Sequence, residues 1–283
     1  MRKIIILIYV LFITNFITGQ LPRIQSRQSL YIEMWSRNDK HISSATGFII
    51  KPKKQYYLVT NWHVATGKNP INKMWEDTSN KIAPYYVKIF YNRYFERKEV
   101  VYAEQVIKDE ILFDNKNKPI WHQDTLGKEM VDVVEIPLTD TNDVSIYPID
   151  YKNKYDTIIV SPTSVAFAVG YPLGLSSVNE LKLPIWKAGF ISSEPTLNWN
   201  NEPLILFDVN GFPGMSGSPV YYIPKSFSTI RGGEYWYEIS FILGVYSESI
   251  YQTEPNKNIL FNKSVFGCLW KIDYLRPLFN KLP

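Results

Sequence analysis

The feature that most constrains the fold is a succession of short runs rich in β-branched and aromatic residues, separated by turn residues. We expect strands at residues 45–50, 56–60, 85–91, 100–106, 131–136, 157–160, 164–169, 185–192, 204–207, 219–223, 235–246 and 259–261. No stretch alternates strands with helices in the way that builds a parallel sheet. The pattern therefore predicts an all-β barrel or sandwich.

Four segments fall outside this pattern. Ser29–Trp35 fits either a first strand or a short lead-in helix, and Lys108–Glu129 is expected to be a polar insertion between strands. Thr139–Tyr155 is polar and turn-rich, which favours a connection between two halves. One helix is expected at Ile272–Asn280, and it should be short because it contains Pro277, which a helix easily tolerates only in its first turn.

The N-terminus has the pattern of a secretory signal peptide. A basic start, Met1–Lys3, is followed by an apolar run, Ile4–Ile17, and by a small residue, Gly19, near which we expect cleavage. The apolar run falls short of the roughly 20 residues that a spanning helix needs, so a retained membrane anchor is the weaker alternative. We expect a secreted or periplasmic protein with no stable membrane insertion after cleavage.

Charge and cysteine content narrow the function classes. The formal net charge is +4, and Arg2 and Lys3 supply two of these charges. The lysines are spread along the chain, so we expect no nucleic-acid partner. The single cysteine, Cys268, excludes an internal disulfide and is expected to be a buried structural thiol. No phosphate loop, dinucleotide fingerprint or zinc-ligand spacing is present, so we expect no cofactor and no metal. The Asn, Lys, Ile and Tyr usage suggests an AT-rich, bacterial genome.

A serine turn at Gly211–Pro219 is the first candidate for chemistry. Ser216 lies between Gly214 and Gly217, and strand-like runs flank the turn. Small residues there leave room beside the hydroxyl and allow backbone N–H groups to point at whatever it attacks. The alternative is an ordinary tight turn, and the stretch alone does not decide between the two.

A nucleophilic serine needs a base, and the chain has three histidines. His41 and His122 lie in polar segments. His63 follows the apolar run that begins at Leu58, so we expect it at the rim of a rigid strand, although alone it could be an ordinary histidine.

The base in turn needs an orienting carboxylate. Asp132 lies among valines, where an unpaired carboxylate would be costly. Three other aspartates are poorer candidates because they lie in polar loops: Asp109, Asp114 and Asp124. Asp208 is also a poorer candidate, because it is expected to brace its own loop.

Seven short motifs occur in one order along the chain, at residues 45–49, 58–64, 131–134, 169–174, 189–192, 214–219 and 243–247. With them the chain resembles chymotrypsin/trypsin-like serine peptidases of the bacterial type. The resemblance implies two antiparallel six-stranded β-barrels with the site in the cleft between them, and a short C-terminal helix. It divides the chain into a signal peptide at 1–19, an N-terminal lead-in at 20–42, a first barrel at 43–145 and a second barrel at 146–283.

The resemblance also implies residue roles. Ser216 would be the nucleophile, His63 the general base and then acid, and Asp132 the orienting carboxylate. The backbone N–H groups of Gly214 and Ser216 would form the oxyanion hole. An extended substrate would pair with the strand around residue 245, and the implied substrate-binding residues are Asn210, Val245, Tyr246, Ser247 and Glu248.

The chain also departs from animal trypsins. Met215 stands where they carry an Asp that pairs with a new N-terminus, and no Ile-Val-Gly-Gly start is present. The oxyanion hole must therefore form by other means. Ser218 replaces the usual second glycine after the nucleophile. Asn210 stands six residues before the serine in place of Asp, so we do not expect a strict preference for Arg or Lys.

These observations predict an exported serine endopeptidase that acts on peptide or protein substrates through an acyl-enzyme. Two alternatives remain at this point. One is a protease-fold binding module without turnover, because fold does not fix function. The other is an esterase that uses the same three residues.

Overall fold

The structure is a computed structural model, and it describes residues 15–17, 21–70, 72–77, 81–97, 100–126, 129–152, 160–224, 240–251 and 264–283. The predicted signal peptide lies outside this range except for a three-residue strand, β1 (Asn15–Ile17). The strand expected at 259–261 and most of the one at 157–160 also lie outside it. In the part of the chain that is described, no helix is both long and apolar enough to cross a membrane.

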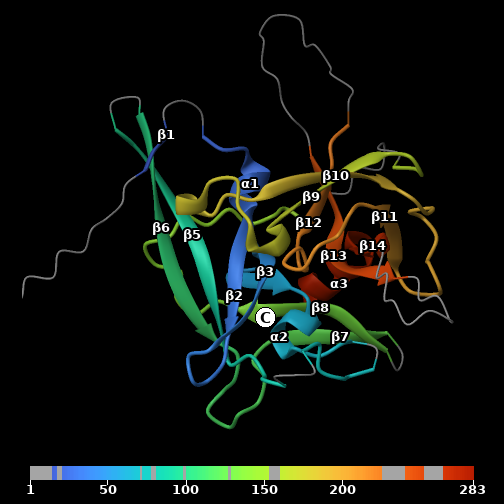
Figure 1. The fold of residues 1–283 in the computed structure, drawn as a ribbon, viewed down its shortest axis with the longest axis horizontal. Helices are drawn as coiled ribbons and strands as arrows, with labels where there is room; N and C mark the ends of the chain where they lie inside the picture. The colour runs from blue at the N-terminus through green and yellow to red at the C-terminus, as the bar shows by residue number, and fades with distance from the viewer. Residues whose placement is uncertain are drawn as a thin grey trace, which may run out of the picture.

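The N-terminal half forms an eight-stranded antiparallel sheet in the order β1-β6-β5-β2-β3-β4-β8-β7 (Figure 1). Its strands after β1 are β2 (Ser29–Trp35), β3 (His41–Ile50), β4 (Tyr57–Thr60), β5 (Tyr86–Arg97), β6 (Val100–Ile111), β7 (His122–Leu126) and β8 (Glu129–Pro137). Two short helices accompany them, α1 (Ile24–Gln28) and α2 (Trp62–Thr66). Ser29–Trp35 is thus a strand, and it lies in the interior of the sheet between β3 and β5.

The predicted first barrel is wrong, because this sheet is not closed. The strands β6 and β8 end the run β6-β5-β2-β3-β4-β8, so closure would require them to pair with each other. Instead β6 pairs with β1 over Val101–Ala103, and β8 pairs with β7. Where β6 and β8 end, a side chain joins them: the Glu110 carboxylate accepts hydrogen bonds from the Thr139 N–H and hydroxyl at 2.7 and 2.8 Å.

The predicted polar insertion Lys108–Glu129 is also wrong in part. Its first residues, to Ile111, complete the 12-residue strand β6, and His122–Leu126 forms β7. β7 is an edge strand of mostly polar residues, and Lys108, Asp109 and Glu110 interrupt the apolar pattern near the end of β6. Such polar residues remove the apolar signal on which strand prediction depends.

The C-terminal half forms a closed six-stranded barrel in the order β10-β11-β14-β13-β12-β9, which confirms the second predicted barrel. Its strands are β9 (Val165–Gly170), β10 (Ile185–Ile191), β11 (Leu204–Asp208), β12 (Pro219–Tyr222), β13 (Phe241–Tyr251) and β14 (Ser264–Lys271), with two 3-10 turns, η1 (Pro172–Gly174) and η2 (Asn179–Leu181). The strand β14 was not predicted. It carries Cys268, which is 4% exposed, as expected of a buried thiol.

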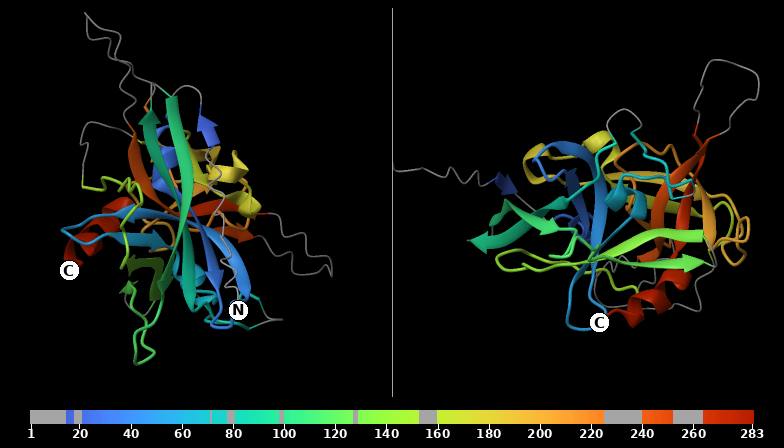
Figure 2. Two further views of the ribbon diagram at one scale, coloured as in Figure 1. Left: turned by 90° about the vertical axis from the view of Figure 1, so that its left-hand side faces the viewer. Right: turned by 90° about the horizontal axis from the view of Figure 1, so that it is seen from below.

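The C-terminal helix α3 (Ile272–Lys281) confirms the predicted helix and continues through Pro277. It packs against β13 and β14, and the right-hand view of Figure 2 shows it in red at the lower edge, beside the green strands of the N-terminal sheet. Buried Arg276 links it to the segment between the halves, because its Nε donates to the Tyr151 carbonyl at 2.8 Å. The largest apolar cluster of the described residues contains residues of both halves, including Tyr57, Val133 and Phe279, so the sheet and the barrel pack against each other.

Candidate active site

Three residues far apart in the sequence form one hydrogen-bonded chain between the two halves. His63 Nδ1 lies 2.8 Å from Asp132 Oδ2, and His63 Nε2 lies 2.9 Å from Ser216 Oγ. A carboxylate can only accept, so Nδ1 carries the proton and Nε2 is left to accept the Ser216 O–H. The structure thus brings the predicted serine, histidine and aspartate together in that order of contact.

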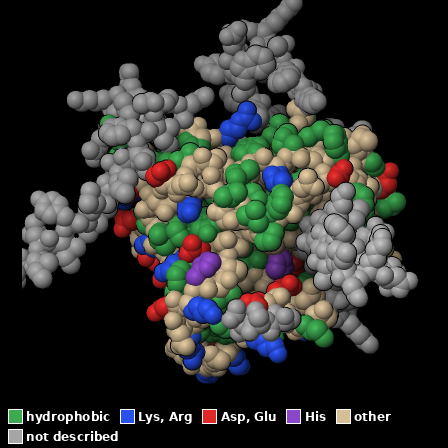
Figure 3. Space-filling view, in the orientation of Figure 1, with side chains coloured by type: hydrophobic (Ala, Val, Ile, Leu, Met, Phe, Trp, Pro, Cys, Tyr) green, Lys and Arg blue, Asp and Glu red, His purple; other side chains and the backbone are tan. Residues whose placement is uncertain are grey.

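The three hydrogen-bonded side chains differ in their exposure to solvent. The Asp132 side chain is 3% exposed, and the His63 side chain is 16% exposed. Histidine side chains, in purple, reach the surface of the face drawn in Figure 3. A carboxylate that is shielded from water keeps a strong interaction with the imidazole, while the serine end remains accessible to a ligand.

His63 lies on the short helix α2. The sequence analysis had predicted that it would lie at the rim of a strand, and this prediction is wrong. Asn61 is the N-cap residue with extended backbone, and Gly67 ends the helix in the left-handed conformation, with φ of 69°. The His63 N–H is one of the first helical amides, which have no partner within a helix, and it donates to Asp132 Oδ1 at 2.9 Å. The aspartate therefore fixes both the backbone and the ring of the histidine.

Asp132 lies on β8 and is held by more than the histidine. The Ser247 hydroxyl donates to Asp132 Oδ2 at 2.5 Å, and the Asn61 side-chain amide donates to the Asp132 carbonyl at 2.6 Å. Three donors thus reach one buried carboxylate: the N–H and Nδ1 of His63 and the hydroxyl of Ser247. This fully hydrogen-bonded state explains how a carboxylate is accommodated among valines.

The loop that carries Ser216 requires its two glycines. Gly214 has φ of 94° and Gly217 has φ of 84°, which is a backbone region that other residues rarely adopt. An added Cβ at Gly214 would lie 2.3 Å from the Tyr171 carbonyl oxygen. Gly217 donates its N–H to the Tyr246 carbonyl at 2.9 Å, which ties the loop to β13.

The N–H groups of Gly214 and Ser216 have no acceptor among the described backbone and side-chain groups. The neighbouring N–H groups of Met215, Gly217 and Ser218 all have one. Two unpaired N–H donors in the loop that carries a serine hydroxyl are the groups needed to bind a developing negative charge on oxygen.

The predicted substrate-binding residues divide into two groups. Val245 and Tyr246 are buried, and their backbone already pairs with β12, β14 and the serine loop. The β13–β14 register shifts between Tyr246 and Ser249, so Ser247 and Glu248 have no β14 partner. Their backbone is the part of the predicted strand that can pair with a peptide. Asn210 is exposed beside the serine loop.

The rejected candidates lie elsewhere. His41 and His122 begin the strands β3 and β7, and Asp109, Asp114 and Asp124 make local ion-pair or backbone contacts. None of them hydrogen-bonds to Ser216 in the described part of the chain. No group of three or more His, Cys, Asp or Glu side chains in the described ranges could hold a metal ion.

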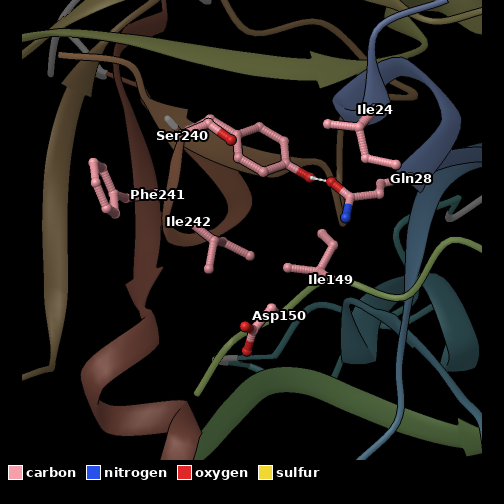
Figure 4. A pocket seen from close by; sticks show the side chains of 8 residues that line it. Ile24, Gln28, Ile149, Asp150, Ser240, Phe241 and Ile242 are labelled. Carbon is pink, nitrogen blue, oxygen red and sulfur yellow. Dashed lines mark hydrogen bonds between the residues drawn. The ribbon is translucent and has the colours of Figure 1, made fainter. Parts of the chain in front are cut away.

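Figure 4 shows a pocket away from this site, between α1, the segment before residue 151 and the strands β12 and β13. Gln28, Ile149, Asp150 and Ile242 are among its lining residues, and the Tyr221 hydroxyl donates across it to Gln28 Oε1 at 3.0 Å. None of the predicted site residues lines it, so it is separate from the candidate active site.

Sequence reasoning missed two residues that build the site, Asn61 and Thr46. Asn61 before an apolar turn that ends in Gly67 is a helix N-cap signal, and it could have predicted α2. Thr46 contacts the serine loop from β3, 168 residues away in sequence from Gly214. No local pattern predicts a contact of that separation.

A family model described as a trypsin-like peptidase domain matches residues 45–222. The match covers more than half of the chain, and the chain belongs to the trypsin-like peptidase domain family.

Solved structures with a similar fold include serine proteases. A serine endoprotease from Yersinia pestis is 12% identical with a TM-score of 0.47, and the match covers 93% of this chain and 67% of that one. A protease from M. tuberculosis in its active form is 12% identical with a TM-score of 0.46, covering 89% and 79%. A thermostable serine protease from an extremophilic microorganism is 14% identical with a TM-score of 0.45, covering 91% and 97%. A search of curated proteins found no match.

Proposed function

We propose that the protein is an exported serine endopeptidase that cleaves peptide bonds through an acyl-enzyme intermediate. The observation that carries this proposal is the hydrogen-bonded chain Asp132–His63–Ser216, with contacts of 2.8 and 2.9 Å. The family membership supports a peptide or protein substrate.

In the proposed reaction Ser216 Oγ attacks the carbonyl carbon of the peptide bond and gives its proton to His63 Nε2. The negative charge that forms on the carbonyl oxygen is bound by the N–H groups of Gly214 and Ser216. His63 then protonates the leaving amine, the C–N bond breaks, and an ester to Ser216 remains. Water, deprotonated by His63, hydrolyses this ester and restores the serine hydroxyl. Asp132 holds the imidazole in the required tautomer and stabilises its charged form.

The substrate would bind as an extended strand. The backbone of Ser247 and Glu248 is left without a β14 partner, and the Ser247 carbonyl lies 3.3 Å from Ser216 Oγ. A peptide that pairs there would place its scissile bond beside the hydroxyl.

A peptide-library digest tests the proposal. We expect the wild-type protein to produce internal cleavages and the Ser216→Ala variant to produce none. Turnover of activated esters with no peptide cleavage would favour an esterase. A folded wild-type protein that cleaves neither would favour a binding module.

Export is part of the same proposal and rests on the N-terminal sequence pattern. N-terminal sequencing of the protein from a secreting host is expected to show a start just after residue 19. A mature chain that begins at residue 1 or 2 would contradict it.

A further inference from the structure

In the serine loop, Gly211–Pro219, hydrogen bonds fix the orientation of successive peptide planes. In a trans peptide the carbonyl and the N–H point in opposite directions, so an anchored carbonyl sets the direction of the N–H that follows it. The Pro213 carbonyl accepts from the Leu173 N–H at 2.6 Å, and the Met215 carbonyl accepts from the Ser218 N–H at 2.9 Å. These two contacts set the directions of the unpaired N–H groups of Gly214 and Ser216.

The peptide plane between them is anchored at both ends: the Met215 N–H donates to the Phe212 carbonyl at 3.1 Å, and a side chain holds the Gly214 carbonyl. The Thr46 hydroxyl donates to the Gly214 carbonyl at 2.8 Å. The Tyr171 N–H, which can only donate, lies 3.1 Å from the same hydroxyl oxygen. The hydroxyl proton is therefore left for the Gly214 carbonyl, which can only accept. The Thr46 N–H also donates to the Ser216 carbonyl at 2.9 Å. Thr46 therefore hydrogen-bonds to the loop on both sides of Met215.

Thr46 is itself fixed in place. It is 0% exposed, and its carbonyl accepts from the Thr60 hydroxyl at 2.9 Å. Its surroundings are crowded, because a Cβ added at Gly170 would lie 2.7 Å from the Thr46 hydroxyl oxygen, and one at Gly217 would lie 2.1 Å from its carbonyl oxygen. Since Thr46 belongs to β3, these contacts fix the barrel's serine loop to the N-terminal sheet.

Met215, the residue before the serine, has no charge with which to orient the loop. Met215 is 0% exposed and packs with apolar barrel residues such as Val220 and Leu269. We propose that Thr46 is a positioning residue, whose hydroxyl holds the Gly214–Met215 peptide so that the Gly214 and Ser216 N–H groups face an oxyanion. The inference rests on the proposed function and names one residue that helps to keep the oxyanion hole formed.

The test compares Thr46→Val, which keeps the shape and removes the hydroxyl, with Thr46→Ser, which keeps the hydroxyl. The readout is the second-order rate of labelling by a biotinylated fluorophosphonate, whose phosphoryl oxygen needs the same N–H donors. Loss of one oxyanion donor costs about 10²–10³ in kcat, so displacement of the loop should slow labelling by about 10- to 100-fold in Thr46→Val. Thr46→Ser should remain within about threefold of wild type, and with p-nitrophenyl acetate the Thr46→Val loss should fall on kcat and not on KM.

Ser29→Ala is the matched control. Ser29 is buried on β2, and its hydroxyl donates to the Val169 carbonyl at 2.7 Å without touching the serine loop. We expect this variant to lower the thermal unfolding midpoint while its labelling rate stays near wild type. If Thr46→Val does not fold, Thr46→Cys, which keeps the volume with a weaker donor, should show the same loss of labelling.

The outcomes separate the two proposals. A folded wild-type protein that does not react with the probe would contradict the proposed function. A reactive wild type with equal labelling rates for Thr46→Val and Thr46→Ser would overturn the role of Thr46 alone. A wild-type rate in a folded Thr46→Cys variant would also overturn it.

Discussion

Replacing Glu135 by Gln should make the protein more stable at alkaline pH and change little at acidic pH. Glu135 lies on β8, three residues after Asp132, and is only 5% exposed. Burial, and secondly the nearby Asp124 carboxylate, raise its pKa from 4.5 to about 8. The folded protein therefore holds a proton on Glu135 that the unfolded chain releases above pH 4.5.

The sign and size of the effect follow from this difference in proton binding. Below pH 4.5 both states are protonated, so Glu135 adds no pH dependence. Between pH 4.5 and about 8 unfolding releases the proton, so the free energy of unfolding falls as pH rises. The slope is about 1.4 kcal/mol per pH unit, which gives an upper bound of about 5 kcal/mol over the interval. We expect at least about 2 kcal/mol to be measured, because relaxation around a buried carboxyl lowers the full value.

Urea unfolding followed by tryptophan fluorescence measures this effect, and the chain has 8 tryptophans. The free energy of unfolding is compared between wild type and Glu135→Gln at pH 5, 6.5 and 8. The contributions of the other titrating groups to the free energy of unfolding are the same in both proteins, so they cancel in the difference. The gap should be small at pH 5 and widen in favour of Glu135→Gln as pH rises.

The control is Glu180→Gln, which removes a carboxyl that is exposed on η2. It makes the same chemical change at an exposed position. A Glu135→Gln difference from wild type that does not change with pH would refute the reasoning, because it would mean that Glu135 ionises alike in the folded and unfolded states.

Two further predictions concern the site. Ser247→Ala removes the hydroxyl that donates to Asp132 Oδ2 at 2.5 Å, and it should lower kcat for peptide cleavage by about tenfold, whereas an unchanged kcat would show that this contact is dispensable. Gly170→Ala places a Cβ 2.0 Å from Ser218 Oγ, and it should lower the thermal midpoint by about 3–10 °C. Adding Ser218→Gly should recover part of that loss, and strict additivity of the two changes would argue against the clash.

Strand prediction succeeded where apolar and β-branched residues dominate a short run. The strands β9 to β12 have alternating or continuous apolar residues, and all four were predicted within two residues of their ends. The edge strand β7 was missed because its residues, His122–Leu126, are mostly polar. The local sequence pattern could not show that the N-terminal sheet stays open, since closure depends on which strands pair at the two edges of the sheet.

The local sequence around His63, Asp132 and Ser216, together with the family resemblance, selected them, and the structure brings their side chains together. Their supports were harder to find. Ser247 was expected to face the substrate, yet its hydroxyl contacts Asp132. Thr46 carries no local signal, because its role depends on a loop from the other half of the fold.

The most direct test of the account is the mass of the protein after reaction with a fluorophosphonate. We expect one adduct per folded molecule, mapped to the peptide that contains Ser216 and absent from both Ser216→Ala and His63→Ala. Undiminished labelling of Ser216→Ala, or an adduct on any other residue, would contradict it.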